Sequence, residues 1–174
     1  MENKSNSLKN IMITCGLLLG GISIVFNLML FFLKMHYEQS TAVGIVSVVI
    51  MIGVLLFAFI QYKKSNEGYI SLSEAIKIGL GVSLISTILG IIYAFILTEF
   101  LDPGMMEKVL DLQMEKIRAS NPEISQEALD STRSMSEKFS SPLIRSAFQL
   151  IFALFIGFII SLIGGLFVKK SRPE

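Results

Sequence analysis

The sequence predicts an all-α integral membrane protein, with four transmembrane helices and an extracytoplasmic helical hairpin between the third and the fourth. Of its 174 residues, 52% are hydrophobic and 17% are charged, whereas soluble domains carry about a quarter charged residues. Four stretches of 21 to 24 residues contain no Asp, Glu, Lys, Arg or His, and each is long enough to cross about 30 Å of hydrocarbon. We therefore expect a single membrane domain over residues 1–174.

The uncharged stretches set the predicted spans, because a charge at the centre of a helix costs about 2.5–3.5 kcal/mol on insertion scales. The spans are about 10–33, 39–62, 74–98 and 146–168. The third helix is expected to begin before its uncharged part, since Ser71 and Glu74 form a capping-box pattern. The first stretch exceeds the apolar run of about 7–15 residues in a signal peptide, and no cleavage-site pattern follows it. It is therefore predicted to be a span.

The longest connection, residues 99–145, carries the signals of two further helices. Asp102-Pro103 and Asn121-Pro122 each pair an N-cap residue with proline at the first helical position. Apolar residues recur at helical spacing after Pro103 and predict an amphipathic helix of about 16 residues, with a second, more polar helix from Pro122. The Met-rich apolar face of this hairpin has three possible roles. The two helices could pack on each other and on the ends of the spans, the face could bind a partner, or it could lie on the lipid surface.

Basic residues predict the orientation. The N-terminal segment, the 63–77 connection and the C-terminus together hold eight Lys and Arg over 31 residues, against seven over 52 residues in the other two connections. The side with the denser positive charge is the cytoplasmic one. Both termini are thus expected in the cytoplasm and residues 99–145 outside it.

Small residues follow narrow stripes along three of the spans and predict faces for helix packing, because small side chains let helix backbones approach closely. These residues are Gly16, Gly20 and Ser23, then Gly79, Ser83 and Gly90, then Ala153, Gly157 and Ser161. The second span has no continuous stripe and is expected to be the most peripheral helix. Asn27 and Gln149 are the strongly hydrogen-bonding residues well inside a span. Interhelical packing is the favoured interpretation of both, and a polar path through the membrane is the alternative.

Several function classes lack their signature. A net charge of +1 excludes a nucleic-acid binder, which needs a concentrated positive field. Cys15 is the single cysteine, so no intrachain disulfide or CxxC site exists, and its place inside a span predicts an apolar core thiol. His36 has no companion at metal-ligand spacing. We expect no metal, no cofactor and no enzymatic activity, since no nucleophile with a base and no phosphate-binding Gly loop is visible.

One inner connection and the features around it carry a family resemblance. Residues 68–79 read GYISLSEAIKIG, a small-residue span with Tyr93 follows, and the acidic Met-rich loop ends in FSSP at 139–142. This arrangement resembles the DUF4199 family of small bacterial integral membrane proteins of unknown function. The resemblance implies four helices and a long extracytoplasmic loop in the bacterial cytoplasmic (inner) membrane. It implies no catalytic residue.

These patterns together predict a non-catalytic multi-pass protein in the lipid bilayer. An accessory or assembly subunit is the favoured function, acting as a homo-oligomer or with a membrane protein partner. The alternative is a small transporter or lipid-handling subunit. That alternative would require an oligomer, because four tightly packed helices are expected to leave no water-filled path within one copy.

Overall fold

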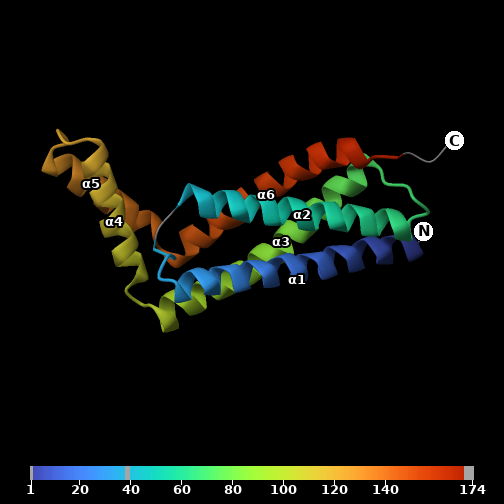
Figure 1. Cartoon of the computed structure of the whole chain (residues 1–174), viewed down its shortest axis with the longest axis horizontal. Helices are drawn as coiled ribbons and strands as arrows, with labels where there is room; N and C mark the ends of the chain where they lie inside the picture. The colour runs from blue at the N-terminus through green and yellow to red at the C-terminus, as the bar shows by residue number, and fades with distance from the viewer. Residues whose placement is uncertain (1, 38–39, 171–174) are drawn as a thin grey trace.

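The computed structural model describes residues 2–37 and 40–170, with side chains from residue 6 onward, and its regular elements are helices. In chain order they are α1 (Glu2–Phe32), α2 (Thr41–Ser65), α3 (Leu72–Ile96), the π-helix η1 (Leu97–Leu101), α4 (Met105–Ser120), α5 (Gln126–Phe139) and α6 (Pro142–Val168). The four long helices form an elongated bundle, and α4 and α5 lie at the end away from the N-terminus (Figure 1).

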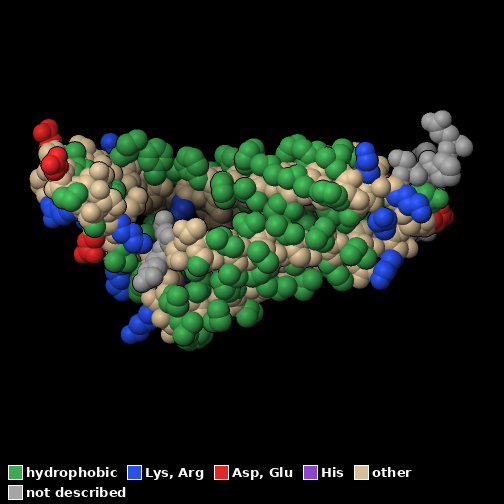
Figure 2. All heavy atoms as spheres, turned by 45° about the horizontal axis from the view of Figure 1, so that its top comes forward, with side chains coloured by type: hydrophobic (Ala, Val, Ile, Leu, Met, Phe, Trp, Pro, Cys, Tyr) green, Lys and Arg blue, Asp and Glu red, His purple; other side chains and the backbone are tan. Residues whose placement is uncertain are grey.

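Four helices are long and apolar enough to cross a membrane, as the sequence predicts. They cover Asn6–Phe32, Thr41–Ser65, Leu72–Leu101 and Pro142–Val168. Hydrophobic side chains cover the visible face of the bundle, and charged side chains gather at its two ends (Figure 2). This surface is the one a lipid environment requires, since exposed residues such as Phe167 and Phe32 keep 87% and 78% of their area accessible.

The helix starts follow local hydrogen bonding. At α3 the predicted capping box is present: Glu74 N–H donates to Ser71 Oγ at 3.2 Å, and Ser71 N–H donates to Glu74 Oε2 at 2.8 Å. At α2, Ser40 is the N-cap and accepts from Ala42 N–H. The predicted first residue of this span, Gln39, lies outside the described residues.

Two predicted N-caps between α3 and α6 are wrong. The N-cap of α4 is Gly104 instead of Asp102, because the Asp102 carboxylate accepts a hydrogen bond from Tyr37. The N-cap of α5 is Ser125, whose hydroxyl accepts from Ala128 N–H at 3.2 Å. Asn121 instead ends α4, since its backbone N–H still donates to the carbonyl of Ile117.

The packed core lies toward the end of the bundle that holds the N-terminus. Its largest fully buried side chains include Tyr62, Phe59 and Leu55 of α2, with Ile78 and Val82 of α3. As expected, α2 is the most peripheral of the four long helices by its backbone contacts with the others. Large side chains of its second half nevertheless enter the core.

Backbone contacts close this end of the bundle. Ile70 and Lys170 exchange two backbone hydrogen bonds of 3.1 and 2.9 Å, and Lys63 Nζ donates to the carbonyl of Val168 at 3.1 Å. The chain before α3 is thereby joined to the end of α6.

Candidate functional site

The small-residue stripes form helix contacts inside this one chain. Gly16 and Gly20 of α1 lie against Ile85 and Leu89 of α3, so close that a methyl group on either glycine would collide with those side chains. Helix α3 is thus the central helix, with α1 on one side and α6 on the other.

The contact between α3 and α6 is reciprocal. The Ser161 hydroxyl of α6 occupies the space beside Gly79 of α3, and the Ser83 hydroxyl of α3 occupies the space beside Gly157 of α6. Each glycine and serine on one helix are four residues apart, which places them on the same face. The backbones of α3 and α6 approach closely here.

Beyond this contact the helices line a cavity of about 550 Å³ that is open to the surface. It is lined by residues of all four long helices, η1, the start of α4 and the connection after α1, and its walls are predominantly apolar. Volumes of about 300–1,000 Å³ are typical of small-molecule sites. The surface is hollowed beside the end of the bundle that carries α4 and α5 (Figure 2).

The cavity is deep. Its lining on α3 and η1 runs from Ser83 to Thr98, which at 1.5 Å per residue is about 22 Å along the helix axis. The inner end is closed by the α3–α6 contact and by Met51, whose methyl group lies 3.3 Å from the position that a Cβ on Gly157 would take.

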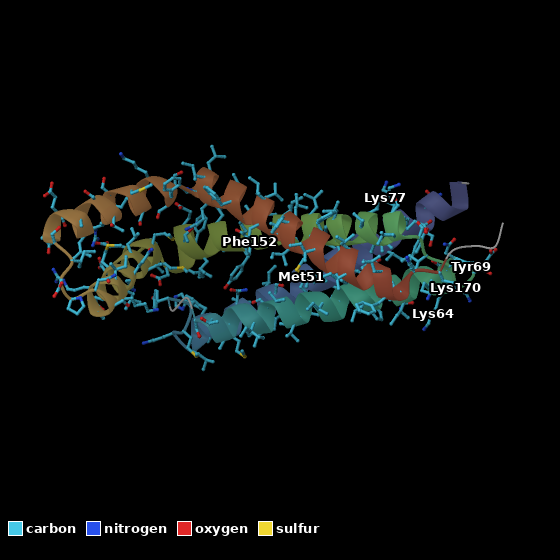
Figure 3. The ribbon with its side chains drawn as sticks, turned by 90° about the horizontal axis from the view of Figure 1, so that it is seen from above. Met51, Lys64, Tyr69, Lys77, Phe152 and Lys170 are labelled. Atoms are coloured by element: carbon cyan, nitrogen blue, oxygen red, sulfur yellow. The ribbon has the colours of Figure 1, made fainter. Side chains whose placement is uncertain are left out.

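Divergence of α2 and α6 opens the space. The two helices converge toward the end marked by Lys64 and Lys170 and separate toward the other end, with Met51 and Phe152 at the part where they separate (Figure 3). Phe59 of α2 still packs against Gly164 of α6 near the converging end. The cavity therefore begins beside the packed core, at Leu19 and Met51, and extends toward the end of the bundle that carries α4 and α5.

A cluster of polar groups stands at the outer end of the cavity. The Asp102 carboxylate, at the end of η1, accepts a hydrogen bond from Tyr37 and lies 3.3 Å from His36 Nε2 and 3.6 Å from Lys108 Nζ. Lys108 also donates to the Tyr37 hydroxyl at 3.1 Å. The Tyr37 hydrogen bond is the main cause that lowers the pKa of Asp102, against the opposing effect of burial. The cluster ties the connection after α1 to η1 and α4.

Arg145 is the one residue among the described cavity lining that carries a permanent charge, and the lining contains no Asp or Glu. Its guanidinium donates to Thr98 Oγ1 at 3.5 Å and to the Met106 sulfur. Within the described part of the chain it has no carboxylate at ion-pair distance, whereas Arg133 on α5 pairs with Asp111 at 2.7 Å and Glu137 at 3.2 Å.

Three lining residues hold buried polar atoms that have no hydrogen-bond partner among the described residues. They are His36 Nδ1, Tyr93 OH and Ser83 Oγ. The His36 side chain is only 6% exposed. Buried polar atoms are nearly always paired with protein, water or ligand. These three atoms therefore indicate that water or the polar group of a ligand occupies the cavity beside them.

The cavity brings together most of the residues that the sequence singled out. Asn27 and Gln149 both line it, with Ser23, Ser83, Gly90 and Ala153 of the stripes, while the other stripe residues lie in the helix contacts. The side-chain amide of Asn27 donates to the carbonyl of Ser23 at 2.8 Å, so this hydrogen bond lies within α1 and not between helices. Cys15 is buried in the core, away from the cavity.

Sequence reasoning missed Arg145, Tyr93, Thr98 and the His36 ring as parts of one site. The available signal was their position along the spans: these residues, like Asn27 and Gln149, lie in or near the ends of the spans that meet the 33–40 and 99–145 connections. No group of three or more potential metal ligands occurs among the residues that the structure describes.

Comparison with known proteins gives one match. The family model described as a protein of unknown function, DUF4199, matches residues 14–170. No curated protein and no solved structure matches the chain.

Proposed function

The chain belongs to the DUF4199 family, and we propose that it is a non-catalytic, multi-pass protein of the bacterial cytoplasmic membrane that binds an amphipathic membrane molecule in its cavity. One observation carries the proposal: a predominantly apolar cavity lies between helices long enough to span a membrane, and the one permanently charged residue of its described lining, Arg145, lies near the end that carries α4 and α5. Such a cavity matches a molecule with an apolar chain and a polar headgroup.

The charge distribution supports an orientation with the cavity in the outer half of the membrane. Basic side chains gather at the closed end of the bundle (Figure 2). Five lysines belong to the last turn of α2, the first two turns of α3 and the chain after α6: Lys63, Lys64, Lys77, Lys169 and Lys170. A cytoplasmic location is favoured for this end. On this proposal both termini are cytoplasmic, and α4 and α5 form the extracytoplasmic helical hairpin.

The packing favours a ligand-binding function over pure assembly. Gly79, Gly157 and Ser161 are used in contacts within one chain, so they leave no small-residue face of that stripe for a second copy. The structure also provides a cavity inside a single copy, although its closed inner end leaves no continuous path through the described part of the bundle. A lipid-handling function therefore does not depend on oligomerisation.

A tryptophan reporter tests the proposal, because the natural chain contains no Trp. Met51→Trp places the indole at the cavity wall, and Ile52→Trp places it on the neighbouring, exposed position of the same helix. A brominated single-chain fatty acid should quench the tryptophan fluorescence of Met51→Trp saturably, as expected for binding at a defined site. The fluorescence of Ile52→Trp should instead fall in proportion to the concentration of the fatty acid in the micelle. Proportional quenching of both variants would contradict the proposal.

An accessory or assembly subunit is the second candidate function, and α5 favours it. Met135 and Phe139 expose 62% and 48% of their area on this helix, outside the apolar spans. A membrane protein partner or a second copy would cover them. Met135→Cys, in a Cys15→Ser background, would form a disulfide-linked dimer in membranes if a second copy covers this face, and the matched exposed position Glu127→Cys would not.

A further inference from the structure

We infer that the molecule bound in the cavity is a membrane lipid with an anionic headgroup, a phosphate or a carboxylate, which pairs with Arg145. This inference rests on the proposed function and names the ligand class of the same site. It starts from the charge balance of the cavity lining, which contains one permanent cation and no acid among the described residues.

The position of Arg145 is unfavourable for a positive charge that has no anionic partner. It is half-buried in the first turn of α6, where the helix dipole is positive and disfavours a second positive charge. Its protein partners are the neutral oxygen of Thr98 and the sulfur of Met106. An anion in the cavity would satisfy both the guanidinium and the helix terminus.

The acid of the polar cluster beside the cavity already has partners. Asp102 is engaged by Tyr37, His36 and Lys108, and no ion pair joins it to Arg145. The Lys108 charge also balances that of Asp102, and no carboxylate of residues 6–37 or 40–170 pairs with the positive charge of Arg145. Charge complementarity therefore selects an anion.

Other polar residues line the same cavity as Arg145 and could hydrogen-bond to an anionic headgroup. Gln149 lies four residues after Arg145 on α6 and lines the same cavity, as do Tyr93, with its unpartnered hydroxyl, and His36, with its unpartnered Nδ1. A guanidinium presents two parallel N–H donors to a phosphate or carboxylate, and amide and phenol donors add to this pattern.

The apolar part of the cavity identifies the source as the membrane. Beyond Gln149 the lining includes the apolar Ala153, Leu19 and Ile24 as well as hydroxyl residues of the helix walls, and it continues toward Ser83 between helices long and apolar enough to cross a membrane. A free phosphate would leave this part unfilled, whereas an acyl or isoprenoid chain would fill it and gain the favourable transfer of apolar surface.

Binding to purified full-length protein in detergent tests the inference with three probes: a monoacylglycerol phosphate, the uncharged monoacylglycerol of the same chain length, and glycerol 3-phosphate. The phosphate lipid should bind at least about tenfold more tightly than the neutral lipid, as expected for a charge-assisted bidentate pair. Arg145→Gln should abolish this preference, Arg145→Lys should keep part of it, and Arg118→Gln, a basic residue outside the cavity, should leave it unchanged. Thermal unfolding of each variant verifies folding.

The outcomes separate the two proposals. If both lipids bind equally and the cavity-filling variant Ala153→Phe binds neither, the inference of an anionic headgroup is wrong and the proposed cavity function stands. Binding that Ala153→Phe does not affect would contradict both. Glycerol 3-phosphate binding as tightly as the phosphate lipid would show a soluble anion site and overturn the membrane source.

Discussion

The hydroxyl of Ser161 on α6 lies over Gly79 on α3, in the space that any side chain at position 79 would need. The same relationship recurs one turn further along, where Ser83 lies over Gly157. These two contacts fix the crossing of α3 and α6 and close the inner end of the cavity. The packing of the bundle and the shape of the candidate site therefore depend on the same four residues.

Gly157→Leu should destabilise the bundle by about 1–3 kcal/mol or more, the range for overpacking, because its side chain would collide with Ser83. Ile91→Leu keeps the side-chain volume and should be tolerated. Thermal unfolding in one detergent measures both. Equal stability of the two variants would show that α3 and α6 do not meet as described.

Gly90→Leu should behave differently from Gly157→Leu. The nearest atom to a Cβ at position 90 is the terminal nitrogen of Gln149, a flexible group at 3.2 Å beside the cavity. The new side chain would enter the cavity and reduce binding of the phosphate lipid, with a smaller loss of stability. A loss of stability as large as that of Gly157→Leu would contradict the assignment of Gly90 to the cavity wall.

How far the sequence predicts this structure depends on the range of the interactions. Uncharged length and the Ser71–Glu74 capping box are local properties, so the four long helices and the start of α3 were predictable. Arg145 was assigned to the end of a loop because it bounds the uncharged stretch, yet α6 begins at Pro142 and turns that side chain into the cavity. The cavity depends on the divergence of α2 and α6, which no residue spacing encodes.

Asp102→Asn should lower stability at neutral pH, because it removes the negative partner of Lys108 and His36. The folded-state pKa of Asp102 lies below its ordinary value of 3.8. Its stabilising contribution is therefore fully present above pH 3.8 and is lost as the pH falls through the lower folded-state value. Unfolding temperatures of wild type and variant should differ most at neutral pH and converge in acid. A difference that does not change with pH would show that the charge of Asp102 is not involved.

Asn27→Leu should cost less than about 1 kcal/mol of stability, since the amide donates only within its own helix and polar contacts in bilayers are individually modest. Gln149→Leu should cost similarly little but should weaken binding of the phosphate lipid, because Gln149 is next to Arg145 on the cavity wall. Denaturation and binding assays on the same preparations separate the two effects. Unchanged binding with Gln149→Leu would remove this residue from the headgroup site.

Alkaline phosphatase fused after Asn121 should be active, and a fusion after Asn66 should be inactive, because lysine density favours the cytoplasm for the second position. The opposite pattern of activities would place the cavity in the cytoplasmic half of the membrane.

The central claim is that the cavity holds a membrane amphiphile, and native mass spectrometry of protein purified from bacterial membranes measures this most directly. Wild type should carry a bound molecule of defined mass. Ile151→Phe, which adds the same ring on an exposed position of α6, should retain it, and Ala153→Phe, which fills the cavity, should lose it. The same bound mass at the same occupancy in all three proteins would contradict the claim.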